Sequence, residues 1–417
     1  IYYLALIAYD GGYSDKAIEL FSNLLLYNTK DPAIYNYLGE LYYKKDNLKQ
    51  SLYSYEESIK IDPYNSDIYY YLGIIYEKLL NPSKSIKNYQ QAIKMDNNNL
   101  DLVYRLGMIL YREGELKKSI EYLRSYVLSN YEDIEVLEIL ASILNSLNRF
   151  PESIEMYKKL IDYNKDNIDY YSKVAKLYWN LEDYEKSKYY YNIVLENNNF
   201  KGEVYYFLGY IANREGQFEL AKNYLMSAYE CDYISDELFN QFSISLMETQ
   251  DYKDMIYILN QGLNFNPNNL NILYYLGIGY YEIGFYDKSI QLLKEYLLYN
   301  SNDLTAIYKI GLAYFNNSNF SNAYKYLLKT NSNDDYEIFY YLGASKYNLN
   351  EYKSAIPYFK KSLIINPNNK FAIYLLGQSY IALGDKKESK RQLRLLMNID
   401  DSLFDTLKLA FDSKFDI

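Results

Sequence analysis

The sequence predicts an all-α fold made of tandem helical repeats, because one small residue recurs at a nearly fixed interval along all 417 residues. We call this residue the first small position. It is glycine in eight of twelve copies, and successive copies lie 34 residues apart except for one step of 32. The twelve copies are Ala5, Gly39, Gly73, Gly107, Ala141, Ala175, Gly209, Ser243, Gly277, Gly311, Gly343 and Gly377. A fixed period of this length is typical of stacked helix pairs.

A second small residue follows each first small position after twelve residues. Its copies are Ala17, Ser51, Ser85, Ser119, Ser153, Ser187, Ala221, Met255, Ser289, Ala323, Ala355 and Ser389, of which only Met255 is large. Apolar residues around both positions follow helical spacing, as in Tyr69, Leu72 and Tyr76. Glycine within a helix costs about 1 kcal/mol relative to alanine. We therefore expect close helix–helix approach to compensate, with the two small positions facing each other. Gly202 is expected to lie outside these faces and to tolerate enlargement.

The ends of the repeats carry turn residues, and the C-terminus departs from the pattern. Glycines at 12, 114, 216, 284 and 384 are expected in the turn between the two helices. After Asn398 one more amphipathic helix is predicted, with Asp401 or Ser402 as its N-cap. The predicted organisation is a repeat array over residues 1–397 and a capping helix over 398–417. Because the chain starts at Ile1 in mid-repeat, we expect it to be a piece of a longer protein.

Composition excludes several classes of function. The net charge of −10 argues against a primary nucleic-acid binder, since nucleic-acid affinity depends on Lys and Arg. There is no histidine, no glycine-rich phosphate loop and no nucleophile paired with a base, so we predict no enzyme activity, no cofactor and no metal site. No apolar run has the length of a membrane span, so no membrane insertion is predicted. The only cysteine, Cys231, is expected to be a small buried residue.

Taken together, the period, small positions and turn residues resemble those of the tetratricopeptide repeat family over essentially the whole chain, as about twelve repeats. The resemblance implies a right-handed superhelix of antiparallel helix pairs, in which the first helices line a concave groove that binds peptides or partner proteins. The eighth repeat is the weakest match, with Ser243 and Met255 at its small positions. A Lys and Asn pair that some members use to hold a peptide C-terminus is not seen in the first repeat, where Tyr2 and Leu6 stand instead.

Tyrosines and cations on the first helices are the candidate groove residues. The selected residues are Tyr70, Tyr104, Arg105, Arg112, Lys173, Lys176, Trp179, Tyr206, Arg214, Tyr274, Tyr281 and Tyr308. The tyrosines three residues before the small position form either an aromatic ladder that anchors a peptide or simply the residue that the family favours there. Trp179, the only tryptophan, is either a binding hot spot or a space filler beside Asn145 and Asn213.

Two sets of basic residues each permit two interpretations. The cations at 105, 112, 173, 176 and 214 either hold an acidic partner or a peptide carboxylate, or pair with Glu135, Glu138, Asp169 and Glu203. A second run, Lys386, Lys387, Lys390, Arg391 and Arg394, is read as a solvated outer face, with a binding role as the alternative.

The sequence therefore predicts a non-catalytic scaffold that binds an extended peptide or partner protein, one that is acidic if the cations at 105, 112, 173, 176 and 214 act in binding. One alternative is the recognition arm of an enzyme whose catalytic domain lies outside this chain. Helical-repeat RNA binding is a third class, and the acidic balance speaks against it.

Overall fold

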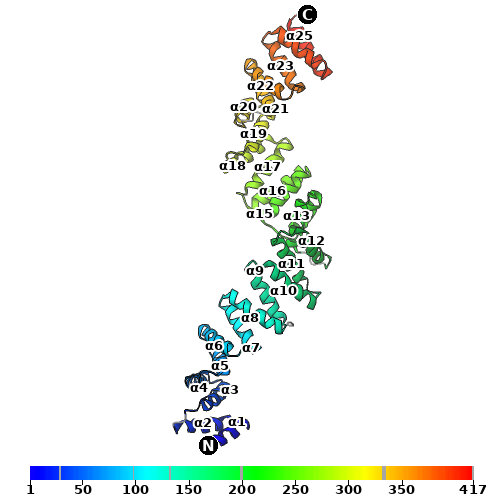
Figure 1. The fold of residues 1–417 in the computed structure, drawn as a ribbon. Coiled ribbons are helices and arrows are strands. Elements are labelled where there is room, and N and C mark those ends of the chain that lie inside the picture. The colour runs from blue at the N-terminus through cyan, green and yellow to red at the C-terminus, as the bar shows by residue number, and fades with distance from the viewer. Residues whose placement is uncertain (28–29, 97, 131–132, 198–200, 331–334, 416–417) are drawn as a thin grey trace. The chain divides into compact units, whose positions relative to one another are not determined.

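A computed structural model describes the chain except for residues 28–29, 97, 131–132, 198–200, 331–334 and 416–417. In this described part every regular element is a helix, and successive helices pack as pairs (Figure 1). The predicted all-α repeat fold is thus confirmed. Contacts along the chain separate two compact units, an N-terminal unit, Ile1–Asn199, and a C-terminal unit, Phe200–Ile417.

The helices of the N-terminal unit are Tyr2–Asp10 (α1), Ser14–Leu26 (α2), Pro32–Lys44 (α3), Leu48–Ile61 (α4), Ser66–Lys78 (α5), Pro82–Met95 (α6), Leu100–Arg112 (α7), Leu116–Ser129 (α8), Ile134–Ser146 (α9), Phe150–Tyr163 (α10), Ile168–Asn180 (α11) and Tyr184–Glu196 (α12). Odd-numbered helices contain the first small position and even-numbered helices the second. Many first helices begin with an Asn or Asp cap, as at Asn99, whose side chain accepts a hydrogen bond from the backbone N–H of Leu102.

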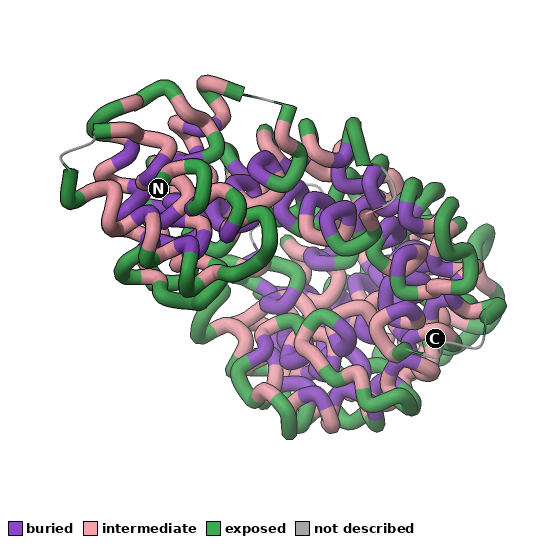
Figure 2. Tube along the Cα trace, turned by 90° about the horizontal axis from the view of Figure 1, so that it is seen from below, coloured by how far each residue is buried: buried purple, intermediate pink, exposed green. Residues whose placement is uncertain are grey.

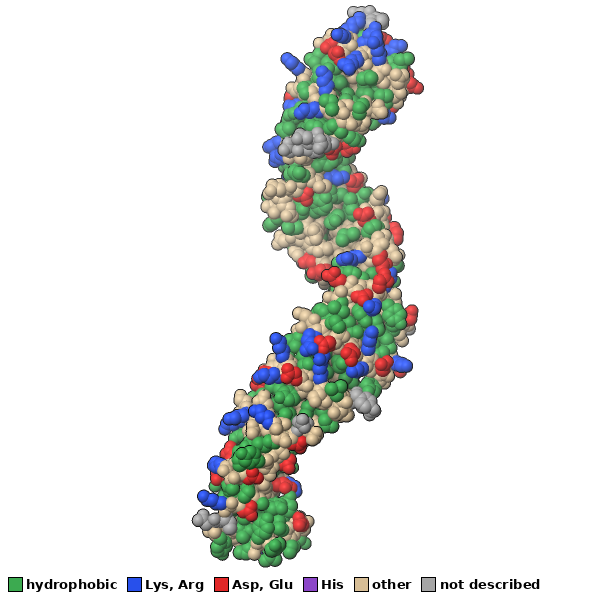
Figure 3. Space-filling model, in the orientation of Figure 1, with side chains coloured by type: hydrophobic (Ala, Val, Ile, Leu, Met, Phe, Trp, Pro, Cys, Tyr) green, Lys and Arg blue, Asp and Glu red, His purple; other side chains and the backbone are tan. Residues whose placement is uncertain are grey.

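The helices of the C-terminal unit are Gly202–Arg214 (α13), Phe218–Glu230 (α14), Asp236–Glu248 (α15), Tyr252–Phe265 (α16), Leu270–Glu282 (α17), Tyr286–Leu297 (α18), Leu304–Asn316 (α19), Phe320–Leu327 (α20), a 3-10 turn Leu328–Thr330, Tyr336–Asn348 (α21), Tyr352–Ile365 (α22), Lys370–Ala382 (α23), Lys386–Leu396 (α24) and Asp401–Phe415 (α25). In both units each helix turns one face inward (Figure 2). On the face shown in Figure 3, Lys and Arg side chains lie both over the last repeats and over repeats of the N-terminal unit.

Close contact within each pair centres on the first small position. A Cβ added to Gly107 would lie 2.6 Å from Leu123, and one added to Gly343 would lie 2.8 Å from Phe359. In both cases the obstructing side chain comes from the second helix, sixteen residues further on. This contact explains why glycine is used inside a helix despite its cost, since a methyl group would overpack the interface.

Serines at the second small position donate hydrogen bonds to the backbone carbonyl of the residue at the first small position. The Oγ of Ser119 donates to the carbonyl of Gly107 at 2.8 Å, and Ser153 and Ser187 do the same to Ala141 and Ala175. The equivalent bonds of Ser51 and Ser85 measure 2.7 and 2.8 Å. These five bonds confirm that the small positions face each other in the N-terminal unit.

The turn between the two helices has one backbone conformation in all twelve repeats. Its left-handed residue is glycine at the five predicted positions, with φ between 73° and 85°. The other seven turns place Asp46, Leu80, Asn148, Glu182, Gln250, Ser318 and Asn350 in the same left-handed region. For a residue other than glycine, this left-handed conformation costs roughly 1–2 kcal/mol. The helix pairing therefore imposes the turn even where the sequence does not favour it.

Neighbouring repeats are joined by a polar contact across twenty residues. Tyr76 donates from its hydroxyl to Glu56 at 2.6 Å, and the Nζ of Lys294 donates to the hydroxyl of Tyr314 at 2.6 Å. Lys158 and Tyr178 form the same contact at 3.1 Å. In each case a second helix meets the first helix of the following repeat. Tyrosine suits this place because its ring is buried while its hydroxyl reaches a polar partner.

The structure corrects three details of the sequence analysis. A Cβ on Gly202 would lie 2.5 Å from the Cβ of Tyr233, so this glycine is tightly packed and the predicted tolerance is wrong. Cys231 is exposed at the end of α14 and is not a core residue. The cap of α25 is Asp400, which accepts from the backbone N–H of Leu403 at 2.9 Å, in place of Asp401 or Ser402.

The predicted terminal helix itself is present as α25. A Cβ on Gly377 would lie 2.6 Å from Leu407 of α25 and 3.2 Å from Gln392 of α24, so both helices pack against α23 at this position. Lys370 Nζ also binds Asp400 at 2.9 Å. The role of α25 as a cap, and the division at residue 397, stay predictions.

Met255 is accommodated by a glycine in the next repeat. Its side chain is fully buried, and a Cβ on Gly279 of α17 would lie 2.5 Å from Met255 Cε. The large residue in the second small position of the eighth repeat is thus matched by an extra glycine in α17.

We expect Ser119→Ala to lower the free energy of unfolding by about 1 kcal/mol, because it removes the buried bond to the Gly107 carbonyl. Ser125→Ala, an exposed position on the same helix, should change it by less than about 0.5 kcal/mol. Urea unfolding followed by circular dichroism compares the two. Equal effects would contradict the structural role of the serine bond.

Met255 and Gly279 should be energetically coupled. Gly279→Ala gains about 1 kcal/mol of helix propensity, but in the native background this gain is opposed by the contact with Met255. In a Met255→Ala background the same change should stabilise by the full amount. A double-mutant cycle from urea unfolding should therefore give a coupling of about 1 kcal/mol, whereas additive effects would show that the two residues do not share space.

Candidate functional site

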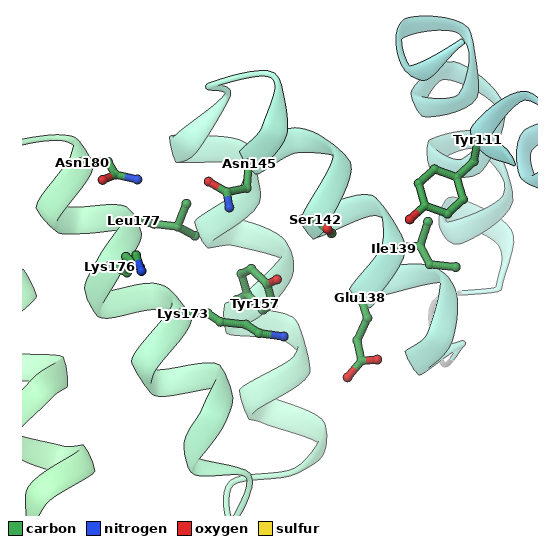
Figure 4. Close-up of a pocket in the computed structure, with 10 residues that line it drawn as sticks. All are labelled: Tyr111, Glu138, Ile139, Ser142, Asn145, Tyr157, Lys173, Lys176, Leu177 and Asn180. Carbon is green, nitrogen blue, oxygen red and sulfur yellow. The ribbon is translucent and has the colours of Figure 1, made fainter. Parts of the chain in front are cut away.

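A hollow of about 450 Å³ lies on the first-helix side of the N-terminal unit (Figure 4). Its lining comes from α7, α9, α10 and α11 and consists of Tyr111, Glu138, Ile139, Ser142, Asn145, Tyr157, Lys173, Lys176, Leu177 and Asn180. Two of these, Lys173 and Lys176, belong to the predicted groove residues. The volume lies within the range of sites that bind small ligands or peptide side chains.

Helical spacing brings the lining residues together. Glu138, Ser142 and Asn145 stand at intervals of four and three residues, so they share one face of α9. The facing wall lies on α11 and is formed by Lys173, Lys176, Leu177 and Asn180. Ile139 and Leu177 supply apolar surface, while the two asparagines supply amides that can both donate and accept hydrogen bonds.

The charged groups of the hollow are arranged unequally. In Figure 4 the Lys173 side chain extends from α11 towards α9, with its Nζ 5.2 Å from the centre of the Tyr157 ring. The only carboxylate of the lining, Glu138, already accepts a hydrogen bond from the hydroxyl of Tyr170 at 2.5 Å. Burial and this bond raise the pKa of Tyr170 to about 12, so the tyrosine stays neutral.

Arg105 and Arg112 lie outside this lining and pair within their own neighbourhood. Arg105 bonds through Nε to Asp101 at 2.7 Å and approaches Glu77 at 3.7 Å. Arg112 binds Glu77 at 3.0 Å. Their carboxylate partners are therefore Glu77 and Asp101, neither of which the sequence analysis had named. For these two arginines the structure shows internal pairing.

Most of the selected tyrosines are half-buried in contacts between helices. Tyr104 packs on Tyr126 with ring centres 5.3 Å apart, and Tyr274 packs on Tyr296 at 5.2 Å. The hydroxyl of Tyr296 in turn donates a hydrogen bond to Asp303, the N-cap residue of α19, at 2.8 Å. Two other selected tyrosines contact acids: the hydroxyl of Tyr70 donates to Asp101, and that of Tyr308 donates to Glu337 at 3.3 Å.

The other selected residues have mixed environments. Tyr206 is only 7% exposed and stacks on Tyr233, so little of its ring is open to a partner. Lys309 Nζ lies 4.6 Å from the ring centre of Tyr281, which is half-buried. Trp179 is half-buried with its ring 5.2 Å from that of Tyr184, and it does not line the hollow. Arg214 is exposed.

Several lining residues were missed by sequence reasoning. Ser142, Asn145 and Asn180 were not selected, because the search favoured aromatic and cationic residues. Their signal was positional: they stand one, four and five residues after the first small position. A search by these offsets, without regard to residue type, would have found them.

Comparison with known families decides the class of the chain. A TPR repeat profile matches residues 41–79, and tetratricopeptide repeat profiles match 70–135, 202–232, 336–369 and 372–402. The repeat geometry described above continues between these segments. The chain is a tetratricopeptide repeat protein. Tetratricopeptide repeats bind peptides or proteins and are generally non-catalytic, so at this level the chain is a protein-interaction scaffold.

Solved tetratricopeptide structures show only distant likeness to this array. MamA MSR-1 is 21% identical over 40% of this chain and 97% of its own, with a TM-score of 0.38. YrrB, a TPR protein with an unusual peptide-binding site, is 18% identical over 52% of this chain and 96% of its own, with a TM-score of 0.37. The Cut9–Hcn1 complex is 14% identical over 97% and 95%, with a TM-score of 0.36. These scores are too low to support an argument. No curated protein matches the sequence.

Within the described residues of the tetratricopeptide array, no helix has the length and apolarity to cross a membrane. The same part of the chain holds no cluster of three or more acidic or thiol side chains placed to bind a metal ion.

We expect Tyr274→Ala to cost at least about 2 kcal/mol of unfolding free energy, because the ring packs against Tyr296 in the repeat core. Tyr257→Ala, on an exposed residue of α16, should cost less than about 1 kcal/mol. Thermal and urea unfolding of the whole chain measure both. If Tyr274→Ala left stability unchanged, its ring would instead be available as a binding anchor.

Proposed function

We propose that this tetratricopeptide array binds an extended, acidic segment of a partner protein in the hollow formed by α7, α9, α10 and α11. The observation that carries the proposal is Lys173, whose side chain extends across the hollow, while the carboxylate of the lining, Glu138, already accepts a hydrogen bond from Tyr170. A partner carboxylate would form charge-assisted hydrogen bonds with the ammonium group of Lys173.

The remaining lining suits a peptide in extended conformation. Asn145 and Asn180 can each bond to backbone N–H and C=O groups, which an extended segment leaves unpaired. Ile139 and Leu177 offer apolar contact for one side chain of the segment. Specificity would come from the carboxylate position, and affinity from apolar burial together with the backbone bonds.

Of the twelve residues selected from the sequence, the proposal retains Lys173 and Lys176 as direct contacts. Arg105 and Arg112 are engaged with Glu77 and Asp101, so they contribute to the local field and not to direct bonding. Trp179 and Tyr206 are not required.

The test uses labelled ten-residue peptides of random apolar sequence with zero to three Asp or Glu residues, with binding to the full chain measured by fluorescence anisotropy. We expect acidic members to bind, and Lys173→Glu combined with Lys176→Glu to weaken binding at least ~10-fold, more at low salt than at high. Ser142→Trp should also reduce binding by filling the hollow.

Lys165→Glu is the matched control, because Lys165 is an exposed lysine in the connection between α10 and α11. It should change affinity by less than about twofold. If Lys165→Glu weakened binding as much as the double variant, binding would depend on net charge alone. If Ser142→Trp had no effect, the peptide would bind elsewhere.

A further inference from the structure

A second candidate surface lies on the opposite set of helices, at the end of the C-terminal unit. The second helices of the last two repeats are strongly basic. Helix α22 carries three lysines and no acid, and α24 carries five cations against one glutamate. Their combined charge is +7 on a chain whose net charge is −10, so the rest of the chain carries −17. Such an asymmetry is typical of a surface that meets an anionic partner.

Most of these cations have no internal acidic partner. Lys387, Lys390 and Arg394 are exposed and form no ion pair with any described residue, and the same holds for Lys353 on α22. Arg391 approaches Glu388 at 3.7 Å, a distance that leaves most of its guanidinium donors open. The charge of this surface is therefore largely uncompensated.

Between the two helices lies a cleft of about 400 Å³ with an apolar lining. It is bounded by Lys360, Leu363, Ile364, Pro367, Ile373, Leu376, Glu388, Arg391, Gln392 and Leu395. Ile364 is 79% exposed and Leu395 is 44% exposed, although both adjoin buried Ile373 and Leu376. Exposed apolar walls beside a basic rim are typical of a helix-binding groove.

An equivalent cleft occurs nine repeats earlier. Comparing the two shows which features come from helix packing and which from the lining residues. In the N-terminal unit the earlier cleft lies between α4 and α6 and has a volume of about 390 Å³. There Lys87 stands where Arg391 stands, but Gln91 takes the place of Leu395 and Asn88 that of Gln392. Helix α4 has no net charge, since Lys49 and Lys60 balance its two glutamates. The neighbouring α6 carries three lysines and no acid, so the α4–α6 pair carries +3 against +7 for α22 and α24. The cleft is thus a feature of adjacent second helices, whereas the leucine in its wall and the higher charge belong to the last pair.

We propose that the face formed by α22 and α24 binds an acidic amphipathic helix of a partner protein. Leucine-type side chains of such a helix would enter the cleft against Ile364 and Leu395, and its carboxylates would bond to Arg391 and Lys390 at the rim. The concave shape favours a helix over a flat membrane surface. The proposal is independent of the peptide site in the N-terminal unit.

The test is fluorescence anisotropy with a labelled peptide of about 14 residues, or four helical turns. The peptide contains leucine at helical positions i, i+3, i+4 and i+7 and glutamate elsewhere. We expect it to bind the full chain, and a scrambled peptide of the same composition to bind at least ~10-fold more weakly. Lys390→Glu with Arg391→Glu, and separately Leu395→Asp, should each weaken binding at least ~10-fold.

Matched changes in the earlier cleft are the control. Lys87→Glu and Gln91→Asp should alter affinity less than about twofold. Circular dichroism checks folding, and the charge-reversal variant tests the proposal even if Leu395→Asp unfolds. Equal binding of the scrambled peptide, or equal loss from the control variants, would overturn the proposal. So would binding to phosphatidylserine vesicles that Arg391→Glu abolishes without any binding of the peptide, because the face would then be a lipid surface.

Discussion

The close approach of two helices at their small positions is the contact on which the other features of the array depend. Glycine at the first position lets the second helix place a large side chain, such as Leu123 or Phe359, directly against the backbone. In the N-terminal unit a serine then bonds to the carbonyl at this point. Once the helices are held this close, the connecting turn has little freedom. Even Leu80 takes the left-handed backbone conformation in its turn, although leucine has no side-chain preference for it.

Several tyrosines lie in the contacts that join one repeat to the next. Such a contact needs a residue that is apolar along its ring and polar at its tip, and tyrosine satisfies both conditions. Tyr76 with Glu56, Tyr314 with Lys294 and Tyr296 with Asp303 are examples from different repeats. These rings hold one repeat to the next. We propose that ligand recognition falls to positions between the rings, where the hollow presents lysine, asparagine and serine side chains.

The fold could be read from the sequence, because the period, the small positions and the turns all describe the same helix pair. The candidate site could be read only in part. Lys173 and Lys176 were found because charge on a first helix is visible in the sequence. The engagement of Arg105 with Asp101 and the burial of Tyr206 against Tyr233 depend on side-chain directions that spacing does not give. Gly202 and Cys231 were misjudged for a related reason, since their surroundings come from the loop before α15 and from the end of α14.

The central claim is that the first small position holds each helix pair together and that its effect is local. The most direct measurement is amide hydrogen exchange of the full chain carrying Gly107→Leu, a change that drives a side chain into Leu123. Because stability in a repeat array is nearly a sum over neighbours, α7 and α8 should lose protection most, adjoining helices less, and the C-terminal unit not at all. Unchanged protection in α7 and α8, or an equal loss along the whole chain, would contradict this account.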